Sequence, residues 1–140
     1  FSRHPRYRTA TITQLWHYDG EAAVASQVDL DWARCLGGDW APVPGGVVAL
    51  LADGVRFRPA FLKRTASGWQ RFDLTGAHVG NVATLDVTVD GATIVYEHSS
   101  AQQPPQWYAA RLDGARMLRP SRLTELNRRG PTSRPARSRW

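Results

Sequence analysis

The sequence contains one cysteine and one lysine, and it has no long apolar run. A single cysteine excludes an intramolecular disulfide framework and every metal site built from several cysteines. The longest uninterrupted apolar stretch, residues 47–52, is far too short to cross a membrane, so we expect no membrane partner. No basic-then-apolar leader follows Phe1, so we expect no secretory signal and a cytoplasmic location. A chain that does not start with methionine is expected to be a fragment or a processed product.

The chain has 140 residues, which suits one domain and is too short for two. Hydrophobic residues make up 42% of it, enough to build a core and to argue against wholesale disorder. The net charge of +6 is concentrated at the ends, because residues 128–140 hold five arginines and residues 1–8 hold three. Residues 9–127 carry ten basic residues against twelve acidic ones. Nucleic-acid modules usually carry basic residues on a folded face, so we expect no nucleic-acid partner.

The tail over residues 128–140 combines its five arginines with two prolines, a glycine and no acidic residue. Such a segment buries too little apolar surface to pack, so we predict a disordered basic tail. Nucleic-acid binding through the basic ends is the weaker alternative. Salt-dependent binding that disappears with the tail would reveal only the electrostatics of the tail.

The body of the chain is typical of β-strands. Short runs of branched and aromatic residues are separated by Gly, Asp and Pro about every 8 to 12 residues, as in a sandwich, barrel or propeller. Asp-Gly pairs at 90–91 and 113–114 predict tight hairpins. A helix over residues 21–36 stays open as an alternative, because apolar residues recur there at four-residue spacing. The predicted strands cover residues 47–51, 56–64, 69–74, 82–89, 93–96, 106–112 and 117–123.

The sequence also matches itself after a shift of 46 residues. Residues 48–50 then fall on 94–96, and the glycines at 45 and 68 fall on those at 91 and 114. Phe61 and Leu62 fall on Trp107 and Tyr108, so we expect Phe61 and Trp107 to be equivalent and buried. Leu74 falls on Leu123 after three more residues are inserted, and residues 61–62 fall on 15–16 one shift earlier.

A unit of about 40 to 50 residues has the size of one β-propeller blade, a four-stranded antiparallel sheet covered by its neighbours. We therefore predict an all-β fold, a partial β-propeller of about two to three four-stranded antiparallel blades over residues 13–127. An N-terminal extension over residues 1–12 is expected to precede it. The alternative is a β-sandwich whose strands resemble one another by chance.

Six tryptophans are present, and four of them fall at positions typical of a blade: Trp16, Trp40, Trp69 and Trp107. Aromatic side chains on strands can form a face that stacks on carbohydrate or binds peptides. Each also buries a large area, so we expect these tryptophans to pack between blades.

Several segments resemble the propeller domain of serine peptidases of the prolyl oligopeptidase family, above all its acylaminoacyl-peptidase and dipeptidyl-peptidase branches. Residues 39–42, Asp-Trp-Ala-Pro before Gly45 and Gly46, resemble the turn that opens a blade, although the usual Asp-Gly is replaced. Residues 95–100 and 104–108 resemble two strands joined by a Ser-Ser, Pro-Pro connection. Residues 122–127 resemble the segment that closes such a propeller.

The resemblance implies a non-catalytic domain that caps the cleft of an α/β-hydrolase domain and admits only short peptides. The parent enzyme would remove dipeptides or acylated N-terminal residues. The likeness covers residues 13–127 and departs from the family beyond that point, where the basic tail stands in place of a strand leading to the hydrolase domain. The alternative is a free-standing propeller or sandwich module that binds proteins and has no enzymatic parent.

The chain lacks the pattern for bond cleavage by serine. A nucleophile elbow usually reads Gly-x-Ser-x-Gly, and it needs a histidine base and an acid. Only Ser67 precedes a glycine, and it lies in a predicted turn. The four histidines, His4, His17, His78 and His98, form no zinc-binding pattern. Cys35 is expected to be a small buried residue. We predict no catalytic, metal-binding or cofactor-binding residues in this chain.

Two more expectations concern the strand at residues 93–96 and its neighbour. His98 follows Glu97 along a strand, so their side chains should point to opposite faces, and His98 is expected to be an ordinary strand residue. Glu97 and Arg111 could pair across strands, although an exposed pair contributes little.

Overall fold

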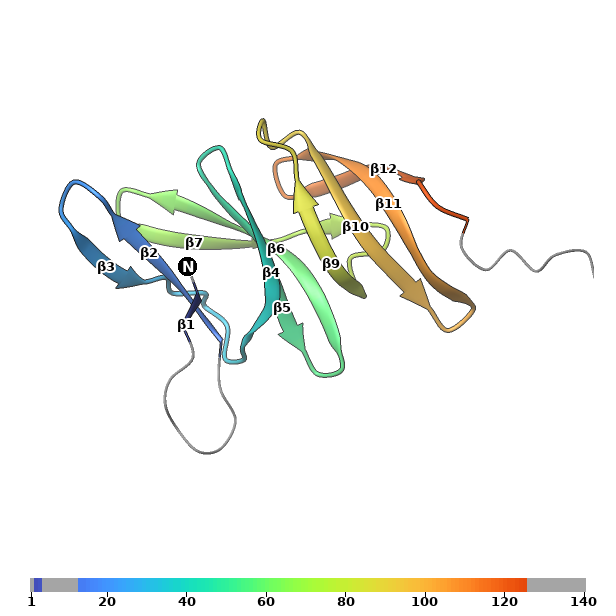
Figure 1. Cartoon of the computed structure of the whole chain (residues 1–140), viewed down its shortest axis with the longest axis horizontal. Helices are drawn as coiled ribbons and strands as arrows, with labels where there is room; N and C mark the ends of the chain where they lie inside the picture. Colours follow the sequence, from blue (N-terminus) through green and yellow to red (C-terminus); the bar gives the residue numbers. More distant parts are fainter. Residues whose placement is uncertain (1, 4–12, 126–140) are drawn as a thin grey trace, which may run out of the picture.

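The structure is a computed structural model that describes residues 2–3 and 13–125. These residues form an all-β fold without a helix, and their strands make three sheets that lie side by side along the molecule (Figure 1). The tail at 128–140, and residues 1 and 4–12 of the expected extension, lie outside the described residues. The first sheet contains β1 (Ser2–Arg3), β2 (Gln14–Asp19) and β3 (Val24–Gln27). The middle sheet contains β4 (Leu36–Val43), β5 (Gly46–Asp53), β6 (Arg56–Thr65) and β7 (Gly68–Asp73). The third sheet contains β8 (Thr75–Gly76), β9 (Val82–Val87), β10 (Thr93–Ser100), β11 (Gln103–Asp113) and β12 (Arg116–Arg122).

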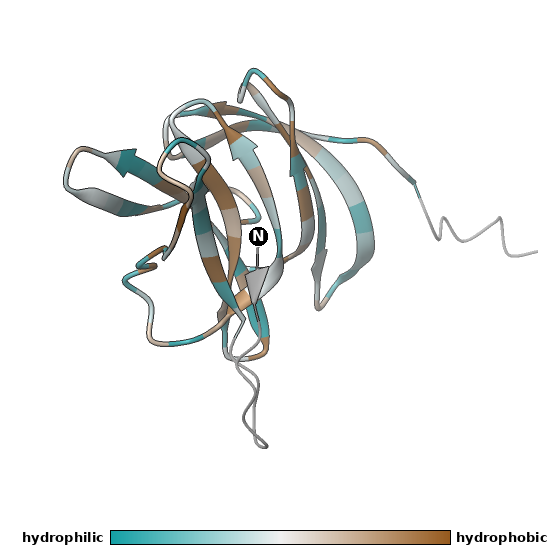
Figure 2. Ribbon diagram, turned by 60° about the vertical axis from the view of Figure 1, so that its left-hand side comes forward, coloured by the Kyte–Doolittle hydropathy of each residue, from teal (hydrophilic) through white to brown (hydrophobic). Residues whose placement is uncertain are grey.

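The middle sheet is covered on both faces. Hydrophobic residues line the strands of the sheets (Figure 2), and β5 is apolar over most of its length. Because successive side chains of a strand point to opposite faces, β5 contributes to two cores. Val48 and Leu50 of β5 belong to the first core cluster, which lies between the middle and third sheets. Ala49 and Leu51 belong to the second core cluster, between the middle sheet and the first. The sheets are therefore held together by apolar packing of face on face.

The middle and third sheets are built in the same order. Each contains four consecutive antiparallel strands, β4-β5-β6-β7 and β9-β10-β11-β12, and the short β8 adds a parallel strand beside β12. β4 and β9 begin at Leu36 and Val82, so the first strands are separated by the offset that the sequence match predicts. The pairing of β9 with β10 also repeats that of β4 with β5 over the same offset, from Ala41 with Val48 to Val87 with Ile94.

The hydrogen bond at the end of the last strand also recurs from sheet to sheet. One residue beyond the last strand of each sheet, a backbone N–H donates to a carbonyl of the preceding strand. Leu74 donates to Pro59 (3.0 Å) and Leu123 donates to Trp107 (2.8 Å). Val28 donates to Leu15 (2.9 Å) in the first sheet. Leu74 and Leu123 therefore occupy matching points, as the sequence predicts.

The expected equivalence of Phe61 and Trp107 is wrong. The carbonyl of Trp107 accepts a hydrogen bond from Leu123, as the carbonyl of Pro59 accepts one from Leu74 in the middle sheet. Phe61 pairs with Val48, whereas Ile94, which matches Val48, pairs with Ala110. The three extra residues therefore lie in the hairpin of β10 and β11, whose pairing shifts near His98, and not between Gly114 and Leu123 as the sequence match requires. Phe61 and Trp107 are both half-buried, and the fully buried neighbours are Leu62 and Tyr108.

Residues 21–36 form no helix. They contain β3 and an extended connection in which alternate residues, Val28 and Leu30, are buried in the second core cluster. Val24, which the helical spacing would bury, is 57% exposed. The four-residue spacing thus reflects separate contacts of an extended chain and not one helical face.

Two turn assignments are also wrong. Residues 39–42 belong to β4 and form no turn; Pro42 is tolerated there because β4 is an edge strand. The turn lies at Pro44 and Gly45, whose φ of 78° suits the third position of a type II turn. Pro104 and Pro105 likewise lie inside β11 and not in the connection before it.

Gly46 approaches the neighbouring strand too closely for any side chain. A Cβ atom there would lie 2.1 Å from the carbonyl oxygen of Leu62 and 2.9 Å from the ring of Phe61. Because backbone would have to move, Gly46→Ala is expected to lower the free energy of unfolding by about 1 to 3 kcal/mol. Urea titration monitored by circular dichroism measures this change. Gly80→Ala is the matched control, since a Cβ at Gly80 meets no atom within 4 Å. Equal midpoints for the two variants would contradict the close approach.

Candidate functional site

The serine hydroxyls of the described residues form no catalytic triad. Ser67 lies in the turn between β6 and β7, with its Oγ 3.2 Å from Oγ1 of Thr65. Ser99 Oγ accepts a hydrogen bond from the side-chain amide of Asn81 (3.1 Å). Ser100 Oγ accepts bonds from the backbone N–H groups of residues 102 and 103. None of these three hydroxyls is bonded to a histidine, so no base is placed to activate a nucleophile within residues 13–125.

Metal-ligating side chains are also scattered in the part of the chain that the structure describes, and no group of three or more could hold an ion. Cys35 is a free thiol, and it is half-buried where full burial is expected from the sequence. Glu97 and Arg111 are not neighbours, because Glu97 lies opposite Trp107 and Arg111 lies opposite Thr93. Glu97 and His98 do alternate in the cross-strand pairing, so they occupy opposite faces as predicted.

The first strands of the middle and third sheets meet along their edges. The carboxylate of Asp39 on β4 accepts hydrogen bonds from the backbone N–H of Leu85 on β9 (3.3 Å) and from the hydroxyl of Thr84. A wide opening of about 490 Å³ lies beside this contact, and we call it the β4–β9 opening. It is lined by Gly38, Asp39, Trp40, Thr84, Leu85 and Asp86.

The β4–β9 opening has the chemistry to contact an extended peptide. β4 and β9 are both edge strands, and such strands present backbone N–H and C=O groups that can bond another chain. Asp39 and Asp86 add two carboxylates that could accept hydrogen bonds, and Trp40 adds a ring that is 37% exposed. The sequence does not predict this site, because no motif in residues 38–40 or in residues 84–86 shows that the two segments are neighbours.

An aromatic groove of about 270 Å³ lies between the first and middle sheets. His17 contacts the ring of Trp69 edge-on at 5.7 Å, and the guanidinium of Arg64 donates to Nε2 of His17 (3.2 Å). The groove is lined by Leu15, Trp16, His17, Tyr18, Val28, Trp40, Val47 and Trp69. It shares Trp40 with the β4–β9 opening.

The tryptophans therefore divide between packing among the sheets and lining an open surface, the two roles that the sequence allows. Trp69 and Trp32 pack against the second core cluster, as the packing expectation requires. Trp40 is partly exposed and belongs to both openings. Trp107 belongs to neither core cluster, so its role is not packing between the described sheets.

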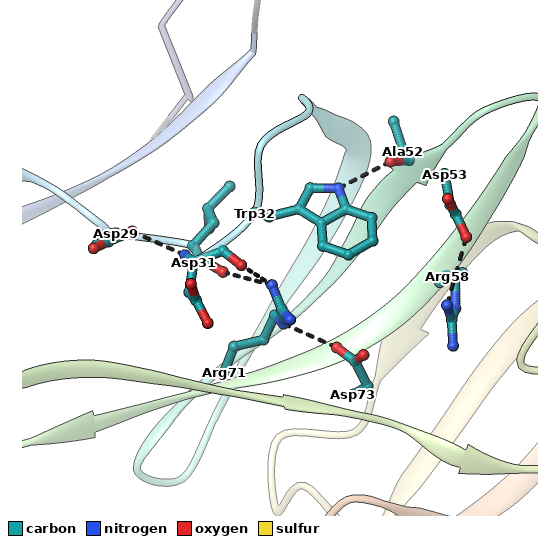
Figure 3. Close-up of polar contacts among 9 residues, drawn as sticks. Asp29, Asp31, Trp32, Ala52, Asp53, Arg58, Arg71 and Asp73 are labelled. Carbon is teal, nitrogen blue, oxygen red and sulfur yellow. Dashed lines mark hydrogen bonds and ion pairs between the residues drawn. The ribbon is translucent and has the colours of Figure 1, made fainter.

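A half-buried arginine fastens the connection between the first and middle sheets (Figure 3). Arg71 on β7 donates to the carbonyl oxygens of Leu30 (3.3 Å) and Asp31, and its Nε pairs with Asp73 at 3.0 Å. Its guanidinium also lies over the ring of Trp32, 5.0 Å from the ring centroid. Trp32 in turn donates from Nε1 to the carbonyl of Ala52 on β5 (2.9 Å). This set of contacts is a structural clamp with no free group for chemistry.

Two histidines that are far apart in sequence stack on one another in the third sheet. The rings of His78 and His98 lie 4.1 Å apart and nearly parallel, and Tyr96 and Tyr108 contact the ring of His78. Burial, with a smaller contribution from His98, lowers the pKa of His78 below its usual value. Burial and the neighbouring Tyr108 raise the pKa of Tyr96 to about 12. His98 lies on β10, as the sequence predicts, and the stack on His78 is a contact that the sequence does not reveal.

No family model, no curated protein and no solved structure matches this chain. Among residues 2–3 and 13–125, no helix is long and apolar enough to cross a membrane. The arrangement of the sheets and their openings is therefore what bears on the function of this chain.

Proposed function

We propose that this chain is part of the β-propeller domain of a serine peptidase of the prolyl oligopeptidase type, and that it screens the short peptides that reach a separate α/β-hydrolase domain. One observation carries the proposal: two consecutive four-stranded antiparallel sheets follow the same order and pack face on face. Blades of a propeller have this strand number, order and packing. The segments that resemble the family lie within these sheets and the residues next to them.

The contact between β4 and β9 also supports the proposal that the sheets are propeller blades. In a propeller, the first strand of each blade lies nearest the central channel. The first strands here meet through Asp39, Thr84 and Leu85, and the β4–β9 opening lies beside them. In the proposed enzyme this opening faces the channel, where edge backbone and carboxylates would contact passing peptides.

The outer face of the third sheet is the place where the proposal puts the next blade. Val95, Trp107, Ala109 and Leu118 belong to neither core cluster. Cross-strand pairing sets Val95 opposite Ala109 on this face, between Asp86 of β9 and Ser121 of β12, so the face carries apolar side chains among polar ones. A neighbouring blade would cover these apolar side chains as the third sheet covers the middle one.

A free-standing interaction module is the second candidate, and the aromatic groove favours it. Trp and Tyr side chains that stay partly exposed around a concavity are typical of binding surfaces. The coding sequence beyond the codon for Asn127, read in all frames, separates the candidates. A hydrolase reading frame with Gly-x-Ser-x-Gly followed by an acid and a histidine supports the peptidase. Its absence from every frame would overturn the peptidase and leave the module.

The purified chain is expected not to cleave chromogenic acyl-aminoacyl or dipeptidyl substrates, because no histidine bonds a serine hydroxyl among the described residues. Release of the chromophore, measured over hours, should match a buffer blank. The control is the same protein carrying Ser67→Ala, Ser99→Ala and Ser100→Ala. Turnover that disappears in this variant would show that one of these serines is a nucleophile.

A further inference from the structure

The stacked histidines join two parts of the third sheet. His98 lies on β10, and His78 lies in the connection from β7 to β9, residues 74–81. A hydrogen bond of 2.9 Å joins Nδ1 of His78 and the hydroxyl of Tyr96. Nδ1 of His98 donates to the carbonyl oxygen of Asn81 (2.8 Å). The two imidazoles thus fasten both the middle and the end of the connection to the sheet.

The backbone of His78 is held in an unfavourable conformation. Its φ of 72° lies in the left-handed region, which residues other than glycine adopt at a cost. The contacts of its ring offset that cost, since Tyr108 lies 4.5 Å from it in an edge-on arrangement. Loss of these contacts would therefore favour departure of the connection from the sheet.

Within the described residues, no acidic group is placed to stabilise a positive charge on either ring. β10 presents Tyr96 to the pair, and β11 presents Tyr108 and the neutral Gln106, which lies opposite His98. On β12, Arg122 lies opposite Tyr108 and pairs with Glu125 at 3.1 Å. The face that the middle sheet turns toward this side is apolar, with Leu50 and Phe57 in the shared core. Every hydrogen bond of the two imidazoles is to a tyrosine or a backbone carbonyl.

We propose that His78 and His98 form a pH-sensitive latch: the neutral pair holds the part of this connection that follows β8, residues 77–81, on the third sheet, and protonation in mildly acidic solution releases it. Two like charges on rings 4.1 Å apart repel one another, so the docked state does not accept a proton on both. The released state can accept both, and acid therefore favours release. The latch does not depend on the proposed function.

The sign of the effect follows from the pKa of His78, which burial lowers in the folded protein. The released state binds more protons than the docked state below about pH 6.5, the ordinary histidine pKa. The stabilisation by neutral His78 is complete above that pH and is lost as the pH falls below it. Because the connection leads directly into β9, release is expected to loosen the β4–β9 edge as well.

Hydrogen exchange of residues 77–81, read as protection factors by mass spectrometry at about pH 7.5 and about pH 5, tests the latch. In the unmodified protein, we expect protection of this segment to fall by about tenfold or more in acid. His78→Phe keeps a ring but cannot be protonated, so the fall should shrink to about threefold or less. If that variant does not fold, His98→Phe should also reduce the fall, but by less, because it removes the repulsion between the rings and leaves the burial of His78 in place.

His17→Phe is the matched control, because His17 also contacts an aromatic ring but lies in the first sheet, away from the connection. It should show the same fall in protection of residues 77–81 as the unmodified protein. Unchanged protection of the unmodified protein in acid would overturn the latch. So would a full fall in whichever of the two latch variants folds, or a fall that vanishes in the His17 control.

Discussion

Leu50→Ala is expected to abolish the cooperative unfolding transition of this protein. The side chain of Leu50 is 0% exposed and lies in the first core cluster, on a strand in the interior of the middle sheet. Truncation of a buried leucine costs about 2 to 5 kcal/mol, because apolar contacts are lost and a cavity remains. The total stability of a domain is about 5 to 15 kcal/mol. A chain that leaves Val95, Trp107 and Leu118 half-exposed on an outer sheet face should lie at the low end, so little or no stability would remain.

Thermal unfolding followed by tryptophan fluorescence and by far-ultraviolet circular dichroism measures this effect. Val55→Ala is the control, because Val55 is 97% exposed in the turn between β5 and β6 and loses almost no contact. The control should melt like the unmodified protein. A sharp transition of Leu50→Ala at an unchanged midpoint would show that the two sheets do not share a core at this residue.

Arg71→Ala should produce the second largest loss. The side chain of Arg71 is only 18% exposed, and it contacts two backbone carbonyls, the ring of Trp32 and the carboxylate of Asp73. Its removal leaves those partly buried oxygens unpaired, which costs about 1 to 3 kcal/mol for such groups. Loss of the cation–π contact adds about 0.5 to 1 kcal/mol. We expect a total loss of about 2 to 4 kcal/mol in urea titrations.

Arg58→Ala is the control for Arg71. Arg58 pairs with Asp53 at a longer distance, 3.5 Å, and its side chain is 43% exposed. Exposed pairs of this kind contribute about 0 to 1 kcal/mol, so this variant should unfold nearly like the unmodified protein. Equal losses for the two arginine variants would show that Arg71 acts as an ordinary surface charge and that the clamp does not hold the connection.

The elements that the sequence predicts correctly are those with local signals. The alternating pattern of residues 82–89 gives β9, and the two Asp-Gly pairs mark the turns that follow β9 and β11. Gly91 and Gly114 adopt positive φ, a conformation that glycine reaches without steric cost. The all-β fold class is confirmed for the same reason, since a period of two is set by neighbouring residues alone.

The features that the sequence does not predict are those that depend on contacts between residues far apart along the chain. A register is fixed by cross-strand partners, so a match of Phe61 with Trp107 along the chain could not reveal that Trp107 takes the place of Pro59. The helix over residues 21–36 stayed open as an alternative because the burial of Val28 depends on another sheet. The pair of His78 and His98 needs the connection to fold back on β10, which no spacing along the chain discloses.

The double coverage of the middle sheet has a consequence for synthesis of the protein. Each sheet consists of strands that follow one another along the chain, so the middle sheet is complete at Asp73, whereas the third sheet needs the chain up to Arg122. A ribosome adds about 5 to 20 residues per second, which leaves Val48 and Leu50 of the nascent chain in water for a few seconds. During that interval the growing chain exposes an apolar sheet face to other nascent chains. Its yield in the cell should therefore depend on translation speed and on chaperones that bind extended segments.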